Sequence, residues 1–354
     1  MATTNKTLIF KKVPTGTPVP GEHLVIEDRG PFDTSAPPPA GGLTLSVLYA
    51  SFDPYLRGRM RPAHIQSYKP AFALDGPVSN HTVARVLQSD CAEYQPGDVV
   101  VAFLPIAEYA TVKKEELGVV VQRKVRNPHG LKDLGLFLGP LGMPGLTGWS
   151  SLHEIGRPKK GETIFISSAA GAVGQVVGQI AKREGLRVVG SVGSDEKLEF
   201  ITKELGFDGG FNYKKERTKE ALKRLAPDGV DIYFENVGGE QLEDALDAMN
   251  DFGRIIACGM ISQYNKPRTE HYGIKNLMHV VSKRLTMRGF IVGDPGFGDK
   301  YAKEHQEKMQ QWLAEGSVTA KLSVTEGIDN AAEGFVGMLE GKNFGKAVLK
   351  IKDE

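Results

Sequence analysis

Residues 162–178 read ETIFISSAAGAVGQVVG, and this stretch decides the fold. The segment TIFI at 163–166 is short, apolar and rich in β-branched and aromatic side chains, which predicts a buried strand. From residue 173 onward, apolar residues recur at helical spacing, which predicts a helix directly after the strand. A second apolar run at 186–190 completes the pattern. These elements together predict a strand–helix–strand unit of a parallel sheet.

The turn between this strand and this helix carries a spaced glycine motif. Ala169, Gly171 and Gly174 have the spacing of the G-x-G-x-x-G fingerprint, with alanine in the first position. Free N–H groups and the positive dipole end of the helix favour a pyrophosphate there, and side chains would block its approach. Gly178 lies on the same helix face as Gly174 and would let the helix pack closely. The motif predicts a dinucleotide site; the alternative is a turn that is glycine-rich for packing alone.

The composition is that of an ordinary globular protein and excludes several classes of function. With 354 residues the chain is long enough for two domains, and a net charge of +1 argues against a broad surface for nucleic acid or anionic lipid. Two cysteines, Cys91 and Cys258, exclude a disulfide framework and a cysteine-rich zinc lobe. Neither a secretory signal nor a membrane-length apolar window occurs, so we expect a cytoplasmic protein.

Two patterns divide the chain. Residues 8–134 show short alternating runs broken by Gly and Pro, which predicts an all-β, barrel-like segment. After the fingerprint, strand patterns alternate with helical ones, which predicts a doubly wound parallel sheet. The strands are expected at 186–190, 210–213, 230–234, 254–259 and 285–290, with helical stretches between them, for example at 196–205, 216–225 and 241–249. An alternating strand at 347–351 could rejoin the N-terminal β-domain.

These patterns predict an α/β protein with three parts. A β-domain is expected at 1–138, a dinucleotide-binding domain at 139–312, and a C-terminal segment at 313–354 that returns to the first domain.

The end of the second strand favours NADP over NAD. NAD-preferring sites carry an acid about twenty residues past the glycines, where it binds the ribose 2′-hydroxyl. Residues 190–194 read GSVGS and contain no acid. The first carboxylates, Asp195 and Glu196, stand where they would open the next helix, and Lys197 follows in its first turn. Small residues with a nearby cation suit a 2′-phosphate; the alternative is that Lys197 is an ordinary surface lysine.

Several motifs fall in the order seen in one family. The sequence resembles the zinc-independent medium-chain dehydrogenase/reductases of the leukotriene B4 12-hydroxydehydrogenase, prostaglandin reductase and alkenal double-bond reductase group, and the resemblance spans nearly the whole chain. The motifs are DPYLR at 53–57, GMPGLTGW at 142–149, AAGAVG at 169–174, GSDEK at 193–197, FNYK at 211–214, FENVGG at 234–239, CGMISQYN at 258–265 and NFGK at 343–346.

The resemblance implies a GroES-like β-barrel catalytic domain, a Rossmann domain that binds NADP(H), and a homodimer. It implies that Lys197 and Tyr213 contact the 2′-phosphate, that Asn236 faces the nicotinamide side, and that Asn343 closes over the cofactor. For both asparagines the alternative is ordinary turn chemistry. The full set of cofactor-binding residues that it implies is Ala170, Gly171, Ala172, Val173, Gly174, Ser194, Lys197, Tyr213, Asn236, Cys258, Gly259, Tyr264 and Asn343.

The resemblance also implies how the reaction proceeds. The enzyme would reduce the C=C bond of an α,β-unsaturated aldehyde or ketone, with hydride going to the β-carbon and Tyr264 stabilising the enolate oxygen through its O–H. Tyr55 would line the substrate pocket, and His81, where many relatives carry an aromatic residue, could face it. Asp53 is expected to fix a turn. The zinc ligands of zinc-dependent relatives are missing, so no metal is expected.

Other functions remain open at this point. One is a zinc-free NADPH quinone reductase, and another is an NADP-dependent allylic alcohol dehydrogenase that works in the oxidative direction. A cofactor-binding protein without catalytic activity is the alternative from a different class.

Overall fold

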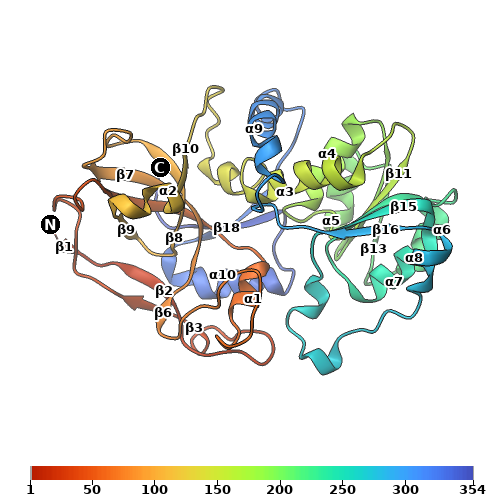
Figure 1. Cartoon of the computed structure of the whole chain (residues 1–354), viewed down its shortest axis with the longest axis horizontal. Helices are drawn as coiled ribbons and strands as arrows, with labels where there is room; N and C mark the ends of the chain where they lie inside the picture. Colours follow the sequence, from red (N-terminus) through yellow and green to blue (C-terminus); the bar gives the residue numbers. More distant parts are fainter. Residues whose placement is uncertain (1, 354) are drawn as a thin grey trace. The chain divides into compact units, whose positions relative to one another are not determined.

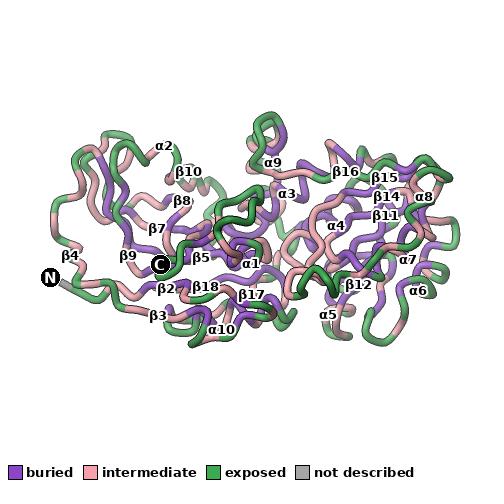
Figure 2. Tube along the Cα trace, turned by 60° about the horizontal axis from the view of Figure 1, so that its bottom comes forward, coloured by how far each residue is buried: buried purple, intermediate pink, exposed green. Residues whose placement is uncertain are grey.

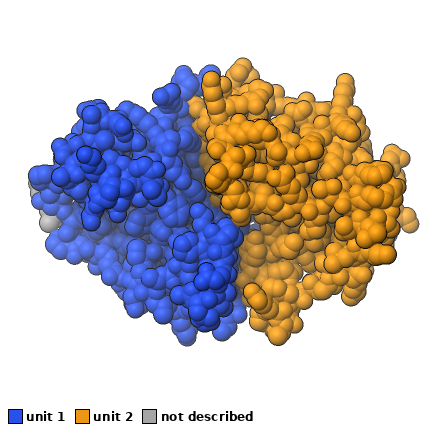
Figure 3. Space-filling view, viewed as in Figure 1, with its two compact units in different colours: residues 1–138, 322–343, 347–354 blue, residues 139–321, 344–346 orange. Residues whose placement is uncertain are grey.

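A computed structural model describes residues 2–353, which form two compact units (Figure 3). Unit 1 comprises 1–138, 322–343 and 347–354, and unit 2 comprises 139–321 and 344–346. Figure 1 labels the helices and strands of both units. Each unit has its own hydrophobic core.

Unit 2 contains the predicted parallel sheet. Its strand order is β13-β12-β11-β14-β15-β16, and every neighbouring pair runs parallel. This is the Rossmann order, with the first strand of the unit in the middle, and it confirms the doubly wound fold. The strands are β11 (Thr163–Ile166), β12 (Arg187–Val192), β13 (Gly209–Asn212), β14 (Val230–Glu235), β15 (Met249–Ala257) and β16 (Thr286–Gly289).

The first strand of this sheet is buried because its side chains are apolar on both faces. All four residues of β11 are buried, and Figure 2 shows the same for most of β12 and β14. On one face, the Phe165 ring stacks on Tyr233 at 4.9 Å between ring centroids and on Phe211 at 6.0 Å. The helices α6 (Thr218–Leu225) and α7 (Gly239–Ala248) contribute buried residues to this same cluster, such as Leu222 and Leu242. Burial on both faces is typical of parallel sheets.

Two elements of unit 2 differ from the expected ones. β15 begins at Met249, five residues before the predicted 254, because Met249 already pairs with Val230 and a bulge separates this pair from the next, Arg254 with Ile232. The helix expected at 196–205 is α5 (Asp195–Glu199) followed by a π-helical turn, Phe200–Glu204. Neither a bulge nor a π-turn changes the apolar spacing enough to be seen in the sequence.

Unit 1 is built mainly from antiparallel strands, as predicted. Its larger sheet has the order β10-β8-β7-β5-β18-β17, and β9 also pairs with β5. The C-terminal strand β18 pairs antiparallel with β5, with Val348 opposite Ser51. The strands are β5 (Leu43–Ser51), β7 (Ser79–Ser89), β8 (Val99–Pro105), β9 (Tyr109–Val112), β10 (Val121–Lys124), β17 (Leu322–Glu326) and β18 (Lys346–Lys350).

Unit 1 also contains a smaller three-stranded sheet, a two-stranded sheet of β1 (Ala2–Thr3) and β4 (Phe32–Asp33), and short helices. The three-stranded sheet has the order β3-β2-β6, built from Leu24–Asp28, Lys6–Phe10 and Gly76–Pro77. The helices α1 (Tyr55–Arg59) and α10 (Ala331–Leu339) pack their apolar residues into one core cluster with Phe10 and Phe52. In the described part of the chain, no helix has the length and apolar character needed to span a membrane.

The helix after the fingerprint, α4 (Gly174–Arg183), packs closely because Gly178 has no side chain. A Cβ atom at this position would lie 2.0 Å from Cζ and 2.1 Å from Cε1 of Phe207. Replacing Gly178 with alanine should therefore lower the free energy of unfolding by about 1–3 kcal/mol, measured by urea denaturation. Gly118, in α2 (Leu117–Val120), has open space around it, so Gly118→Ala is the matched control. An equal loss in both variants would contradict close packing at Gly178.

Candidate active site

The fingerprint turn has the geometry of an anion cradle. Gly171 N–H donates to the Ser168 carbonyl oxygen at 2.9 Å, and Ser168 has a positive φ of 52°. A Cβ atom at Gly174 would lie 2.4 Å from the Ser168 carbonyl oxygen and 2.8 Å from the Ala169 Cα, so no side chain fits there. The helix α4 thus begins with a residue that has no side chain, which fits the approach of a pyrophosphate to the free N–H groups of its first turn.

The last motif of the chain lies beside this turn. Gly345 forms a parallel β-bridge with Gly171, and it has a positive φ of 77° with no room for a Cβ atom. The preceding Phe344 packs its ring edge-on against Phe200, and the Lys321 ammonium lies 4.4 Å from the Phe344 ring centroid. The NFGK motif therefore supports the fingerprint turn through its glycine. Asn343 belongs to unit 1, and its role as a cofactor contact stays a prediction.

The end of β12 brings together the residues predicted to bind a 2′-phosphate. Ser194 caps α5, accepting a hydrogen bond from Lys197 N–H at 3.2 Å. The Tyr213 ring lies against Gly193, where a Cβ atom would be 3.1 Å from the phenol oxygen. Tyr213 remains 45% exposed, so its hydroxyl is accessible to a ligand. Gly193, Ser194 and Tyr213 thus form one uncharged, accessible ledge beside Lys197.

Two lysines make this ledge electropositive. Burial lowers the pKa of the Lys197 ammonium, and the nearby charge of Lys214 lowers that pKa further. Asp195 does not neutralise the positive charge of these lysines, because its carboxylate is held by Asn212 Nδ2 at 2.9 Å and by Lys215. Two cations placed close together favour a doubly charged anion between them. This arrangement fits a ribose 2′-phosphate and lacks the carboxylate of an NAD site.

The residues after β11 and β14 form a buried polar cluster. The Glu235 side chain is fully buried, and its Oε1 accepts hydrogen bonds from Ser167 Oγ at 3.2 Å, Val237 N–H at 2.5 Å and Gly238 N–H at 2.9 Å. Burial raises the pKa of the Glu235 carboxyl. These bonds fix the turn at 235–238 on the sheet edge, although a buried carboxyl is costly.

Asn236 is oriented by this cluster. Its Nδ2 donates to the Ser167 carbonyl oxygen at 2.7 Å, and its backbone N–H donates to Ser167 Oγ at 2.9 Å. Because a carbonyl only accepts, the amide nitrogen must face Ser167, and Oδ1 points the other way. The half-buried Asn236 therefore presents a hydrogen-bond acceptor to a ligand.

The turn after β15 holds Cys258, Gly259 and Tyr264. Cys258 N–H and Gly259 N–H both donate to the Glu235 carbonyl oxygen, at 2.9 and 3.0 Å. Burial raises the pKa of the Cys258 thiol to about 12, so the thiol stays protonated and is no nucleophile. Gly259 makes room for the phenol of Tyr264, whose oxygen would be 3.1 Å from a Cβ atom at that position.

The Tyr264 hydroxyl keeps its own proton available. Its oxygen accepts a hydrogen bond from Met260 N–H at 3.3 Å. Burial raises the pKa of Tyr264, and the Met260 N–H opposes that rise, so the phenol is neutral at physiological pH. A phenol has one proton, and here it is not used by the bond from Met260. Tyr264 is therefore a half-buried hydrogen-bond donor beside Gly259, and a Cβ atom at Gly259 would also lie 3.6 Å from the carbonyl oxygen of Asn236 in the turn after β14.

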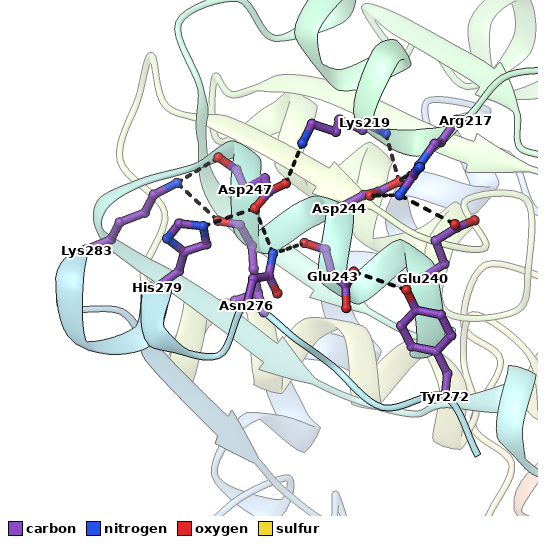
Figure 4. Close-up of polar contacts among 11 residues, drawn as sticks. Arg217, Lys219, Glu240, Glu243, Asp244, Asp247, Tyr272, Asn276, His279 and Lys283 are labelled. Atoms are coloured by element: carbon purple, nitrogen blue, oxygen red, sulfur yellow. Dashed lines mark hydrogen bonds and ion pairs between the residues drawn. The ribbon is translucent and has the colours of Figure 1, made fainter. Parts of the chain in front are cut away.

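Polar contacts hold the chain on both sides of Tyr264. Ser262 Oγ donates to the Val237 carbonyl at 2.6 Å, and Tyr272 N–H donates to Gln263 Oε1 at 3.0 Å. Figure 4 shows how the anchoring continues: the Tyr272 hydroxyl donates to Glu243 at 3.1 Å. Further contacts to Glu243 and Asp247 come from Lys275, Asn276, His279 and Lys283. The loop that carries Tyr264 is thus held by hydrogen bonds both before and after this residue in the sequence.

The predicted substrate residues lie in unit 1. Tyr55 begins α1, and its hydroxyl donates to Oδ1 of the buried Asn80. His81, the next residue of β7, points to the opposite face of the strand, where its Nδ1 lies 3.1 Å from Gln122 Oε1 and its ring meets Phe103 edge-on. Asp53 is buried and accepts hydrogen bonds from Ser51 and Asn80, which agrees with a structural role. Contact of Tyr55 and His81 with substrate stays a prediction.

Comparison with known proteins decides the family. The family model described as "N-terminal domain of oxidoreductase" matches residues 6–120, and that described as "Zinc-binding dehydrogenase" matches 172–314. The chain is similar to the NADP-dependent oxidoreductase RED1 of Cochliobolus heterostrophus, with 53% identity over 99% of this chain and 98% of the relative. The chain belongs to the medium-chain dehydrogenase/reductase family.

Further similarities place it in the zinc-independent alkenal reductase group of that family. The NADP(+)-dependent 2-alkenal reductase of Nicotiana tabacum is 40% identical over 99% of this chain and 98% of its own length. The crystal structure of CurA from Vibrio vulnificus in complex with NADPH has a TM-score of 0.87 at 34% identity, covering 99% of this chain and 100% of CurA. The protein is an oxidoreductase, and its cofactor is NADP(H).

Two further observations concern this medium-chain reductase. Among residues 2–353, no group of three or more His, Cys, Asp or Glu side chains is placed to hold a metal ion. Sequence reasoning missed four residues that lie at or beside the predicted site residues: Lys214, Ser167, Glu235 and Asn80. For Lys214 a signal existed, because it directly follows Tyr213 in the FNYK motif.

The lysine pair makes a prediction for cofactor selectivity. Replacing Lys197 with alanine should raise the Kd for NADPH about ten- to a hundredfold, because a charge-assisted hydrogen bond to phosphate is lost. The Kd for NADH should stay unchanged. Because the pKa of Lys197 is lowered, the wild-type Kd for NADPH should also rise at alkaline pH. Fluorescence titration measures both constants. Lys203→Ala is the control, since Lys203 is exposed and pairs with Glu199. Equal losses for NADPH and NADH would contradict the assignment.

Proposed function

We propose that the protein is an NADPH-dependent reductase of the C=C bond of α,β-unsaturated aldehydes and ketones. The observation that carries this proposal is the direction of the Tyr264 hydrogen bond: the phenol accepts from Met260 and so retains its proton for a substrate oxygen. The family and the 40% identity to a 2-alkenal reductase support the same reaction.

The chain's own residues fit the cofactor. The fingerprint turn would receive the pyrophosphate at Gly174, the ledge of Ser194, Lys197 and Tyr213 would hold the 2′-phosphate, and Asn236 Oδ1 would accept a hydrogen bond from the nicotinamide carboxamide. When bound, NADPH supplies the hydride. Gly171, Ala172 and Val173 lie between β11 and α4, where they would contribute backbone groups only, which suits close approach of a phosphate.

Tyr264 would act on the charge that develops on the substrate. When the β-carbon of an enal or enone gains a hydride, negative charge moves to the carbonyl oxygen as an enolate. A neutral phenol whose proton is available stabilises that oxygen by donating a hydrogen bond. Because burial raises the pKa of Tyr264, the phenol is a better donor of a hydrogen bond than of a proton at neutral pH. The enolate would then take its proton at the α-carbon.

The activity test is NADPH oxidation against enals, enones, quinones and simple aldehydes. Loss of NADPH with a saturated carbonyl product supports the proposal. Turnover of quinones alone would favour the quinone reductase, and reduction of NADP⁺ by allylic alcohols would favour the dehydrogenase. The homodimer that the resemblance implies stays a prediction, which the molar mass in solution tests.

Removing the Tyr264 hydroxyl tests its role within this reaction. Tyr264→Phe should lower kcat for an enone about a hundredfold, because one donor to a developing oxyanion is lost, while the Kd for NADPH stays unchanged. Tyr301→Phe is the matched control, since the Tyr301 hydroxyl donates to Glu154 at 2.8 Å and is not part of the site. An unchanged kcat in Tyr264→Phe would show that this phenol does not act on the substrate oxygen.

A further inference from the structure

A chain of buried polar groups in unit 1 ends on the Tyr55 hydroxyl. Asn80 is fully buried, and its Nδ2 donates to Asp53 Oδ2 at 2.9 Å and to the Ser51 carbonyl oxygen at 2.7 Å. Ser51 Oγ donates to the same Asp53 oxygen at 2.5 Å. Ser51 and Asp53 are also buried, and only Tyr55 is half-buried. A buried polar cluster is costly to desolvate, so its fixed arrangement calls for an explanation beyond packing.

The direction of every hydrogen bond in this cluster is determined. A carboxylate and a carbonyl only accept, so the amide nitrogen of Asn80 must face Asp53 and Ser51. Oδ1 of Asn80 therefore faces Tyr55, and the phenol must be the donor in the bond between them. Since a phenol has one proton, Tyr55 has only oxygen lone pairs left for any other partner.

The charge state of Tyr55 does not change this result. Burial raises the pKa of the Tyr55 phenol, and the charge of Asp53 raises that pKa further, which more than offsets the opposing effect of Arg59. The phenol therefore stays neutral and keeps its proton directed at Asn80. Tyr264 shows the opposite arrangement in unit 2, because it accepts from a backbone N–H and retains its proton.

We propose that Asn80 is a positioning residue that fixes the Tyr55 hydroxyl as a hydrogen-bond acceptor, so that the enzyme selects enals and enones that carry a hydroxyl group. This inference rests on the proposed function and on contact between Tyr55 and the substrate. A substrate hydroxyl donates to the lone pairs of Tyr55, whereas the methyl ether of the same molecule has no proton to donate and leaves the half-buried oxygen unpaired.

The test uses a para-hydroxyphenyl enone and its para-methoxy ether, together with an aliphatic γ-hydroxy enal and its methyl ether. In the wild type, kcat/KM should favour the hydroxyl compound of at least one pair about three- to tenfold, the value of one hydrogen bond. Tyr55→Phe should abolish this preference by lowering kcat/KM for the hydroxyl compound alone. Tyr94→Phe removes a phenol elsewhere in unit 1 and should leave the preference intact.

Asn80→Leu tests the positioning role itself. Without the acceptor at residue 80, the Tyr55 proton is released and can be donated to an ether oxygen, so the preference should fall to about one or reverse in favour of the ether. General damage to the site would lower kcat/KM for both compounds and would not move their ratio. If this variant does not fold, as judged by circular dichroism, Tyr55→Phe still decides whether Tyr55 accepts or donates.

Binding provides a readout apart from turnover. The saturated ketones that correspond to each pair should show the same ratio of Kd values in the complex with NADP⁺, measured by calorimetry. A wild-type preference for the ether that Tyr55→Phe removes would overturn the inference, as would a preference for the hydroxyl compound that neither variant changes. Absence of turnover for every enone would instead refute the proposed function, so the two failures are distinguishable.

Discussion

The site of unit 2 depends on the parallel pairing of β11 with both of its neighbours. Ile166 lies opposite Gly190 of β12 and opposite Phe234 of β14, so the three strands end at one edge of the sheet. Gly190 also leaves room for the fingerprint turn, since a Cβ atom there would lie 2.6 Å from that of Ala169. In a parallel sheet all carboxyl ends share an edge, which is why the residues predicted to bind the pyrophosphate, the 2′-phosphate and the nicotinamide gather there.

The second constraint is the direction of hydrogen bonds at the two tyrosines. Tyr264 accepts from a backbone N–H, which cannot reverse its role, and so its proton is available for an oxyanion. Tyr55 faces an amide oxygen whose orientation is imposed by a carboxylate, and so its proton is committed. Toward a ligand, the tyrosine hydroxyl is therefore a hydrogen-bond donor at Tyr264 in unit 2 and an acceptor at Tyr55 in unit 1. Composition alone does not distinguish the two residues, because the difference lies entirely in their partners.

Much of unit 2 was predictable because its signals are local. The strand at 163–166, the glycines at 171 and 174 and the alternation of strands and helices follow from side-chain spacing along the chain, and the structure contains them. Preference for a 2′-phosphate followed from the missing acid at 190–194. The bulge in β15 was not predictable, because it depends on how Met249 and Arg254 pair with a strand far away in the sequence.

The polar clusters were less predictable than the fold. Asn80 and Asp53 are 27 residues apart, and Ser167 and Glu235 are 68 apart, so no periodic pattern links them. Lys214 was within reach of sequence reasoning, because it directly follows Tyr213 in the FNYK motif. In the structure the nearby Glu216 pairs with Arg224 at 2.6 Å, and the charge of Lys214 acts on Lys197.

In the proposed reaction, hydride reaches the β-carbon of a conjugated carbonyl compound whose oxygen is held by Tyr264. The most direct measurement is to run the reaction with NADPH deuterated at the transferred position of nicotinamide C4, and separately with unlabelled NADPH in heavy water, and to locate deuterium in the product by NMR. We expect label from the cofactor at the β-carbon, label from heavy water at the α-carbon, and an intact carbonyl. Label from the cofactor at the carbonyl carbon, with an alcohol as product, would contradict the proposed reaction.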